Sequence, residues 1–291
     1  MNDYVIYTDS GCDISPHTLS EWGVKMAPLT FTLSNSGREF LDTEMDSKAF
    51  YKKMRDGAEV KTSAVNQTYF KEKFAQILDA GNDILYLGFS SALSSTFSSA
   101  KFAAKELQRE VPERKIITVD TLCASAGLGM IVYLIVKAKE KGATIEDAKE
   151  LALELIPKIC HWFTVDDLSY LKRGGRVSSG GAFFGNVLGI KPVLFMDNDG
   201  LLKSYSKAIG RRAAIEALAN KYGELAEDKT ENTVFISHAD AHSDAKLLER
   251  MLAEKYGATV KMITDVGCVV GGHSGPGTLA LFFIGKQRKG E

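Results

Sequence analysis

The sequence of 291 residues predicts an α/β protein with two domains, because the chain is longer than most single cores. Its first half alternates short apolar runs with amphipathic stretches, which is typical of a parallel sheet covered by helices. Its second half contains a strong hairpin signal, which indicates a mixed or antiparallel α+β domain. We place the N-terminal domain at residues 1–160 and the C-terminal domain at residues 161–291.

Strand and helix signals alternate along the first half. Strands are expected at residues 4–8, 24–33, 84–87 and 115–119. Helices are expected at residues 66–80, 98–110 and 124–141, and Thr144 with Asp147 resembles a capping box that opens a further helix. Asp13 is expected to cap a short helix in which Pro16 sits early.

In the second half the rhythm changes. Residues 190–195 and 201–205 are expected to pair as a hairpin around Asp197-Asn198-Asp199-Gly200. Further strands are expected at residues 234–236, 260–263 and 279–284, with helices at 211–222 and 244–256 between them.

The composition excludes several classes of protein. The 36 basic and 37 acidic residues leave a net charge of -1, and Lys286, Arg288 and Lys289 form only a short basic tail, so a nucleic-acid partner is not expected. The N-terminus has no signal-peptide pattern, and the longest apolar run, residues 130–136, is too short to span a bilayer. Four scattered cysteines without a CxxC pair indicate a reducing compartment. We therefore expect a cytoplasmic protein without stable membrane insertion.

Hydroxyl-rich segments precede two of the expected helices. The segment Ser90-Ser91-Ala92-Leu93-Ser94-Ser95-Thr96 has five hydroxyl residues in seven and enters a helix, and Lys61-Thr62-Ser63 precedes another helix. Ligands of open α/β sheets bind beyond the carboxyl ends of the strands. Hydroxyls at a helix N-terminus suit an anion such as a carboxylate. The alternative is that both segments only cap the helices that follow them.

Histidines occur in two notable segments. Gly271 to Gly277 is a glycine-rich loop that holds His273, which is able to donate to an anion, although a tight turn with an exposed histidine is an equal alternative. His238 and His242 have metal-ligand spacing but no evident third ligand, so no metal site is expected. Asp9 and Asp13 would repel a phosphate near the first strand.

Five segments, taken in order, resemble the DegV family of bacterial fatty-acid-binding proteins, which includes the binding subunits of fatty acid kinases. They are Tyr7-Thr8-Asp9-Ser10, Lys61-Thr62-Ser63, the hydroxyl loop at 90–96, Leu171 to Val177 followed by Gly189-Ile190-Lys191-Pro192, and His273-Ser274-Gly275-Pro276-Gly277. The resemblance runs the length of the chain. It implies two α/β domains that enclose one acyl chain between them.

The resemblance also implies the ligand contacts. Thr62 and Ser94 would hold the carboxylate of a long-chain fatty acid such as palmitate, stearate or oleate, with His273 nearby. Ser63, Ser95 and Arg176 are secondary candidates. The chain would need no cofactor or metal and would have no catalytic residue of its own, because a separate ATP-dependent kinase subunit would form the acyl phosphate. The hydroxyl loops contain no arginine, so we expect neutral donors at the head group.

This sequence departs from the family pattern at three places. Ser95 replaces a usual glycine, Ala64-Val65 replaces Gln-Pro, and Ile209 replaces an arginine that the family associates with kinase docking. Two other functions remain open. One is a serine-type esterase with Ser94 as nucleophile and His273 as base, which would also need an acidic orienting group and an oxyanion hole. The other is a regulatory module whose lipid occupancy controls a protein partner.

Overall fold

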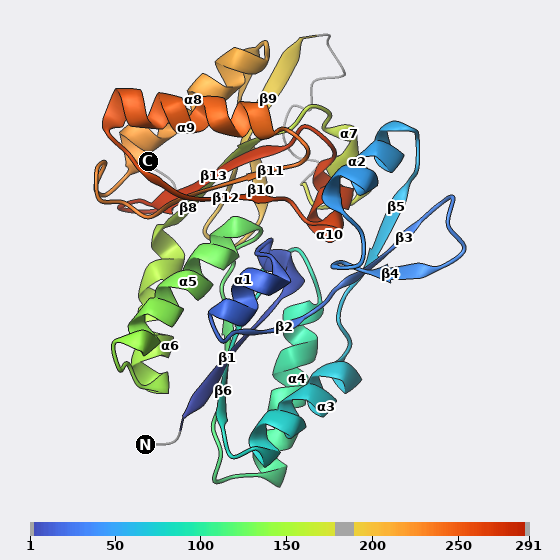
Figure 1. Cartoon of the computed structure of the whole chain (residues 1–291), viewed down its shortest axis with the longest axis vertical. Coiled ribbons are helices and arrows are strands. Elements are labelled where there is room, and N and C mark those ends of the chain that lie inside the picture. Colours follow the sequence, from blue (N-terminus) through green and yellow to red (C-terminus); the bar gives the residue numbers. More distant parts are fainter. Residues whose placement is uncertain (1–2, 178–188, 289–291) are drawn as a thin grey trace.

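The structure, a computed structural model, describes residues 3–177 and 189–288. Its strands form three sheets (Figure 1), and the two larger ones lie in the two halves of the chain. The first of these is parallel throughout and the second is mixed, as the sequence predicts. The division of the chain at residue 160 stays a prediction, although the mixed sheet begins with a strand at Ile159–Thr164.

The parallel sheet has helices on both faces. Its strands are, in spatial order, β2 (Lys25–Ala27), β1 (Tyr4–Asp9), β6 (Asp83–Gly88) and β7 (Ile116–Asp120). The helices are α1 (Pro16–Glu21), α3 (Gln67–Asp79), α4 (Thr96–Glu110), α5 (Ala126–Glu140) and α6 (Ile145–Leu155), with short 3₁₀ turns at Ser10–Cys12 and Ile156–Lys158. Because successive strand residues point to opposite faces, Tyr86 packs with α3 and α4, whereas Leu85 and Leu87 pack with α5.

A small antiparallel sheet lies beside the parallel one. It consists of β4 (Glu39–Leu41), β3 (Thr30–Leu33) and β5 (Val60–Ser63), and α2 (Ser47–Arg55) lies next to it (Figure 1). The single strand expected at residues 24–33 is therefore wrong. Pro28 has no N–H to give to a ladder, and the chain leaves the parallel sheet after Ala27 and enters the small sheet at Thr30.

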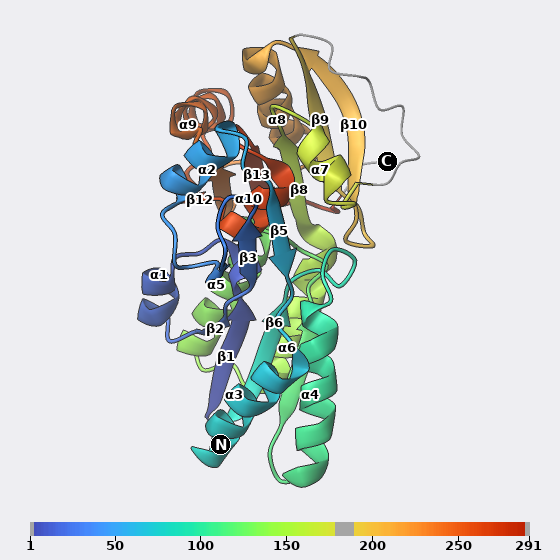
Figure 2. The same ribbon diagram turned by 90° about the vertical axis from the view of Figure 1, so that its right-hand side faces the viewer.

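The mixed sheet faces the parallel half with one of its surfaces. Its order is β10 (Leu202–Ile209), β9 (Ile190–Met196), β8 (Ile159–Thr164), β13 (Leu279–Ile284), β11 (Val234–His238) and β12 (Val260–Asp265). Helices α8 (Arg211–Leu225) and α9 (His242–Tyr256) cover its outer face (Figure 1). The inner face carries Phe163 and Phe282, which share a core with α5. Two short helices, α7 (Ser169–Arg173) and α10 (Cys268–Ser274), lie near this junction (Figure 2).

Two expectations about charged residues fail. Asp13 does not cap α1, because Ser15 does so by accepting from the Thr18 N–H, and Asp13 itself is buried. Arg288 does not belong to an exposed basic tail, since it is 1% exposed. Its guanidinium donates to the carbonyls of Leu122, Asp197 and Ile156 over 2.7, 3.0 and 2.6 Å. Lys289 lies outside the described residues.

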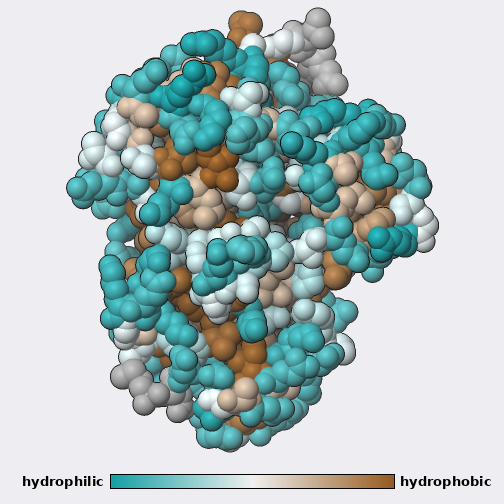
Figure 3. All heavy atoms as spheres, viewed as in Figure 1, coloured by the Kyte–Doolittle hydropathy of each residue, from teal (hydrophilic) through white to brown (hydrophobic). Residues whose placement is uncertain are grey.

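The surface is mainly hydrophilic on the face seen in Figure 3, where hydrophobic residues come through only in patches. Across residues 3–177 and 189–288, none of the helices combines the length and the apolar character that crossing a bilayer requires.

Candidate functional site

A cavity of about 270 Å³ lies where the two larger sheets meet. An apolar cavity of about 150 Å³ is enough to hold benzene, so this one has room for a larger ligand. Most of its wall is apolar, and the main contributors are Leu29, Phe89, Leu93, Phe163, Leu171, Met196, Leu202, Val266, Val269, Val270, Ala280 and Phe282. These residues come from both halves of the chain, so the cavity exists only because the halves are packed together.

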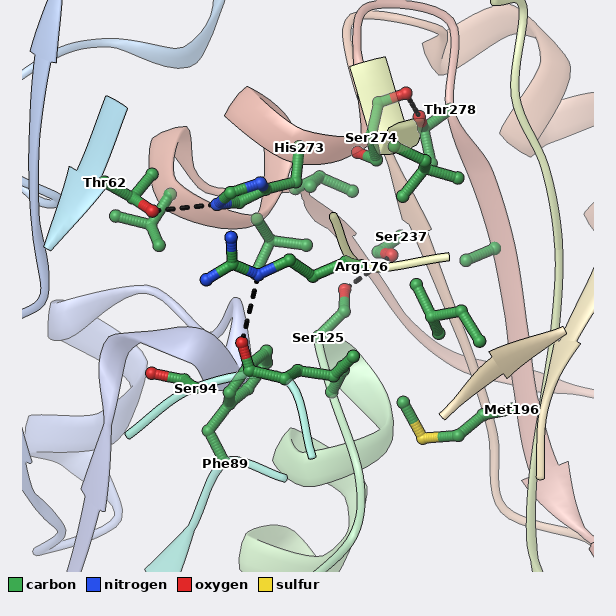
Figure 4. A pocket seen from close by; sticks show the side chains of 18 of the residues that line it. Thr62, Phe89, Ser94, Ser125, Arg176, Met196, Ser237, His273, Ser274 and Thr278 are labelled. Carbon is green, nitrogen blue, oxygen red and sulfur yellow. Dashed lines mark hydrogen bonds between the residues drawn. The ribbon is translucent and has the colours of Figure 1, made fainter. Parts of the chain in front are cut away.

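All six residues expected at the site line this cavity: Thr62, Ser63, Ser94, Ser95, Arg176 and His273. Figure 4 shows Thr62, Ser94 and the end groups of Arg176 and His273 on one side of the view, with Met196 on the other. The four candidate side chains thus gather at one end of a cavity whose wall is mostly apolar.

Thr62 lies on a strand and does not cap a helix. It pairs with Phe31 across the β3–β5 ladder, and its side chain is half-buried toward the cavity. Helix α3 is capped by Asn66, whose side chain accepts from the Tyr69 N–H over 2.9 Å. The capping alternative is therefore wrong for Thr62. Its hydroxyl contacts His273 instead.

Ser94 has two roles at the start of α4. Its hydroxyl accepts from the Thr96 N–H over 3.2 Å and lies 3.0 Å from the Thr96 hydroxyl. Ser95, the N-cap residue, makes no side-chain capping bond. Capping and a place in the cavity wall are thus compatible for Ser94.

His273 lies in the last turn of α10, not in a loop as the glycine-rich segment suggests. Its Nε2 is 2.8 Å from the Thr62 hydroxyl. Burial, together with the nearby charge of Arg176, lowers the pKa of His273 to about 4, so the imidazole is neutral at neutral pH. Gly174 makes room for it, since a Cβ built there would lie 2.2 Å from His273 Nδ1.

Arg176 brings a positive charge to the polar end. Its Nε donates to the Leu93 carbonyl over 3.1 Å and its Nη1 to the Gly174 carbonyl over 2.5 Å. Both acceptors are neutral, and no ion pair with an acidic residue holds it within the described ranges. Arg176 comes from a segment distant from the hydroxyl loops, and it shares the cavity wall with their neutral donors. That the donors at the head group are neutral stays a prediction.

Another wall of the cavity contains a polar cluster that sequence reasoning missed. Ser125 donates to an Asp13 carboxylate oxygen over 2.5 Å and lies 2.9 Å from the Ser237 hydroxyl. Ser125 has a φ of 53°, which is rare for a residue other than glycine. The sequence presents Asp13 as an acid near the first strand and as an expected helix cap, and nothing in it signals the contact with Ser125.

The other chemical candidates find little support. Ser94 Oγ is bonded within its own turn, and His273 Nε2 is bonded to Thr62, so the two do not form a nucleophile–base pair here. His238 and His242 contact one another over 3.2 Å. No group of three side chains suited to a metal occurs in the part of the chain that the structure describes.

Comparison with known proteins gives consistent matches. A sequence model of the DegV family, described as an uncharacterised protein family, matches residues 3–286. A DegV domain-containing protein of Clostridium perfringens is 38% identical over 99% of this chain and 100% of its own length. A DegV lipid-binding protein from Thermotoga maritima is 30% identical with a TM-score of 0.86, covering 99% of this chain and 100% of that one. A DegV family protein from Thermus thermophilus, described by its fatty acid binding, is 28% identical with a TM-score of 0.87, covering 97% and 99%.

Proposed function

The chain belongs to the DegV family, and on that premise we propose that it binds one long-chain fatty acid in the cavity between its two larger sheets. Palmitate, stearate and oleate are the ligands of the expected class. The lipid and fatty acid binding described for the proteins from Thermotoga maritima and Thermus thermophilus supports this class of ligand.

The observation that carries the proposal is Arg176, a cation at the polar end of a mostly apolar cavity, with no acidic partner among the residues that the structure describes. Arg176 is part-buried in the protein alone, and a ligand that fills the cavity shields it further from water. An anionic head group such as a fatty acid carboxylate compensates its charge there. The hydroxyls of Thr62 and Ser94 are additional donors, and neutral His273 is able to donate from one ring nitrogen.

The apolar wall supplies most of the affinity in this proposal. Each buried methylene contributes roughly 0.8 kcal/mol, so a chain of about sixteen carbons gains on the order of 10 kcal/mol before the costs of association. A hydrogen bond to a charged group contributes only about 1.5–3 kcal/mol. The polar end therefore fixes the orientation of the ligand, and the apolar wall holds it.

We further propose that the chain is a carrier and not an enzyme. It presents the bound carboxylate to a separate ATP-dependent kinase in the cytoplasm, where the acyl phosphate forms, and it needs no cofactor of its own. Support for the kinase comes from the family resemblance alone.

The first test is mass spectrometry of organic extracts of the purified protein, beside native mass spectrometry of the intact chain. We expect one fatty acid per chain in the wild type, and a lower occupancy in Thr62→Ala and in Ser94→Ala. A protein that is empty and also fails to take up added palmitate or oleate would contradict the proposal.

The carrier role has a separate test. The palmitate-loaded protein is incubated with ATP and hydroxylamine, which traps an acyl phosphate as a hydroxamate. We expect no hydroxamate from the loaded protein and ATP alone, and hydroxamate when a bacterial fatty acid kinase is added. Hydroxamate formation without the kinase would show that the chain is itself the enzyme.

A further inference from the structure

Helix α10 begins against two buried carboxylates from the other half of the chain. Asp42 Oδ1 accepts from the Val269 N–H over 2.8 Å, and Asp13 Oδ1 accepts from the Gly267 N–H over 2.9 Å. Both aspartates are less than one tenth exposed. The first N–H groups of a helix have no partners within it, and the N-cap residue Gly267 has no side chain to supply one. Asp13 and Asp42 therefore take the place of a local cap.

The same helix carries the polar end of the cavity. Val269 and Val270 line the cavity from its first half, and His273 does so from its last turn. Two consecutive backbone bonds span its length, from the Gly271 N–H to the Gly267 carbonyl over 2.8 Å and from the Gly275 N–H to the Gly271 carbonyl over 2.7 Å. A displacement of the first turn thus passes directly to the turn that holds the imidazole.

The carboxylates are held by N–H and hydroxyl groups rather than by cations. Burial raises the pKa of Asp42 to about 6 and raises the pKa of Asp13 well above its usual value. The backbone N–H groups of Cys268 and Val269 and the Ser10 hydroxyl oppose the rise at Asp42. The titratable groups that face the pair are acidic or neutral, and they comprise Asp9, Cys12, Tyr51, Asp265 and Cys268.

We propose that Asp42 and Asp13 are positioning residues for the head-group site: they fix the first turn of α10 and, through that helix, the imidazole of His273. The inference rests on the proposed function, because it assigns the pair a role in lipid binding. Asp42 and Asp13 lie in the N-terminal half and α10 in the C-terminal half, so the pair also ties the head-group site to the contact between the halves.

The pH dependence follows from the sign of the shift at Asp42. Its folded-state pKa of about 6 lies above the ordinary value, so the carboxylate is mostly charged at pH 7.5 and becomes neutral as the pH falls through about 6. The neutral acid attracts the N–H groups of α10 less strongly. His273 itself titrates only near pH 4, so an effect on His273 near pH 6 comes from a neighbouring group.

The matched pair of variants is Asp42→Asn and Asp9→Asn. Asp9 is also buried, and burial also raises its pKa to about 6. Its carboxylate accepts from the Gly11 N–H, the Phe89 N–H and the Tyr86 hydroxyl, and not from α10. The readouts are the imidazole ¹³C–¹H resonance of His273, assigned against His273→Ala, and palmitate affinity by transfer to albumin.

We expect Asp42→Asn to move the His273 resonance and to weaken palmitate binding about tenfold at neutral pH. The wild-type resonance should shift as the pH falls through about 6, and it should not do so in Asp42→Asn. Asp9→Asn should keep the resonance at neutral pH and keep an inflection, moved to slightly lower pH because the charge of Asp9 contributes to the raised pKa of Asp42. An equal change in the two variants, or no change in Asp42→Asn, would overturn the proposal.

Two controls keep this outcome separate from the proposed function and from misfolding. A wild-type protein without affinity for palmitate would contradict the lipid-binding proposal, whereas the His273 resonance tests the positioning without any ligand. If Asp42→Asn does not fold, the titration of Asp9→Asn decides, and the absence of an inflection near pH 6 overturns the inference.

Discussion

At the scale of single residues, the polar end of the cavity combines one cation with neutral donors. Arg176 holds its place through carbonyl oxygens, and no acidic side chain in the described ranges compensates its charge. Thr62 and His273 contact one another over 2.8 Å and are neutral at neutral pH. An anionic ligand therefore gains most from Arg176.

Removing this charge should weaken the binding of acids selectively. Arg176→Met keeps an unbranched apolar stem but loses the charged donor, so palmitate affinity should fall by about 10- to 100-fold, the equivalent of about 1.5–3 kcal/mol. Hexadecan-1-ol, which has no charge, should bind nearly as well as before. The control is Arg173→Met, since Arg173 is 55% exposed and pairs with Glu59. An equal loss for acid and alcohol would contradict this role of Arg176.

Gly174 should tolerate no side chain, although its backbone conformation is one that any residue adopts. Its φ of -69° suits any residue, but a Cβ there lies 2.2 Å from His273 Nδ1. Gly174→Ala should therefore displace the imidazole and lower the free energy of unfolding by about 1–3 kcal/mol. Denaturant titration measures this loss. Gly37→Ala is the control, because nothing lies within 4 Å of a Cβ at Gly37.

At the scale of elements, caps and side-chain contacts that look alike in sequence separate in space. Asn66 and Thr62 both precede α3, but only Asn66 caps it. Asn66→Ala should therefore lower the free energy of unfolding by about 1 kcal/mol and leave palmitate affinity unchanged. Thr62→Ala should weaken palmitate binding and leave the free energy of unfolding nearly unchanged. Chemical denaturation and palmitate transfer are measured on both variants. A loss of palmitate affinity in Asn66→Ala would contradict the separation of capping from binding.

Most long elements follow from local pattern. The hairpin around Asp197–Gly200 and the capping box at Thr144 and Asp147 occur as expected, because turn and cap chemistry acts within a few residues. The helix α10 and the strand β5 were not expected. Both are short, and both owe their conformation to partners far along the chain: β5 to β3, and α10 to Asp13 and Asp42.

The site follows the same rule. Each of its six expected residues lines the cavity, but their identity came from family resemblance, since each motif alone has an ordinary structural explanation. The effect of the Arg176 charge on His273 and the contact of Asp13 with Ser125 were not accessible, because both depend on how distant segments meet.

At the scale of the whole molecule, Arg288 joins segments of both halves. It donates to three carbonyls: that of Leu122 after β7, that of Ile156 in the turn before β8, and that of Asp197 at the start of the β9–β10 turn. Arg288→Met should leave the carbonyls of Leu122 and Ile156 without this donor, whereas the Asp197 carbonyl keeps the Gly200 N–H, at a cost of roughly 2–4 kcal/mol in the free energy of unfolding. Lys286→Met is the control, because Lys286 is exposed. Equal stability of the two variants by denaturant titration would show that Arg288 is not a structural link.

The hydrogen bond between Thr62 and His273 connects residues 211 positions apart. Closing such a long stretch of chain costs entropy that only the completed fold repays. A partly folded form that lacks this contact has no complete head-group site. A ligand bound at that site therefore stabilises the folded state alone. Mass action then makes the melting temperature rise with ligand concentration, by the equivalent of about 2.7 kcal/mol at a hundredfold excess over Kd. A thermal scan at increasing palmitate thus reports when the distant parts of this chain have come together.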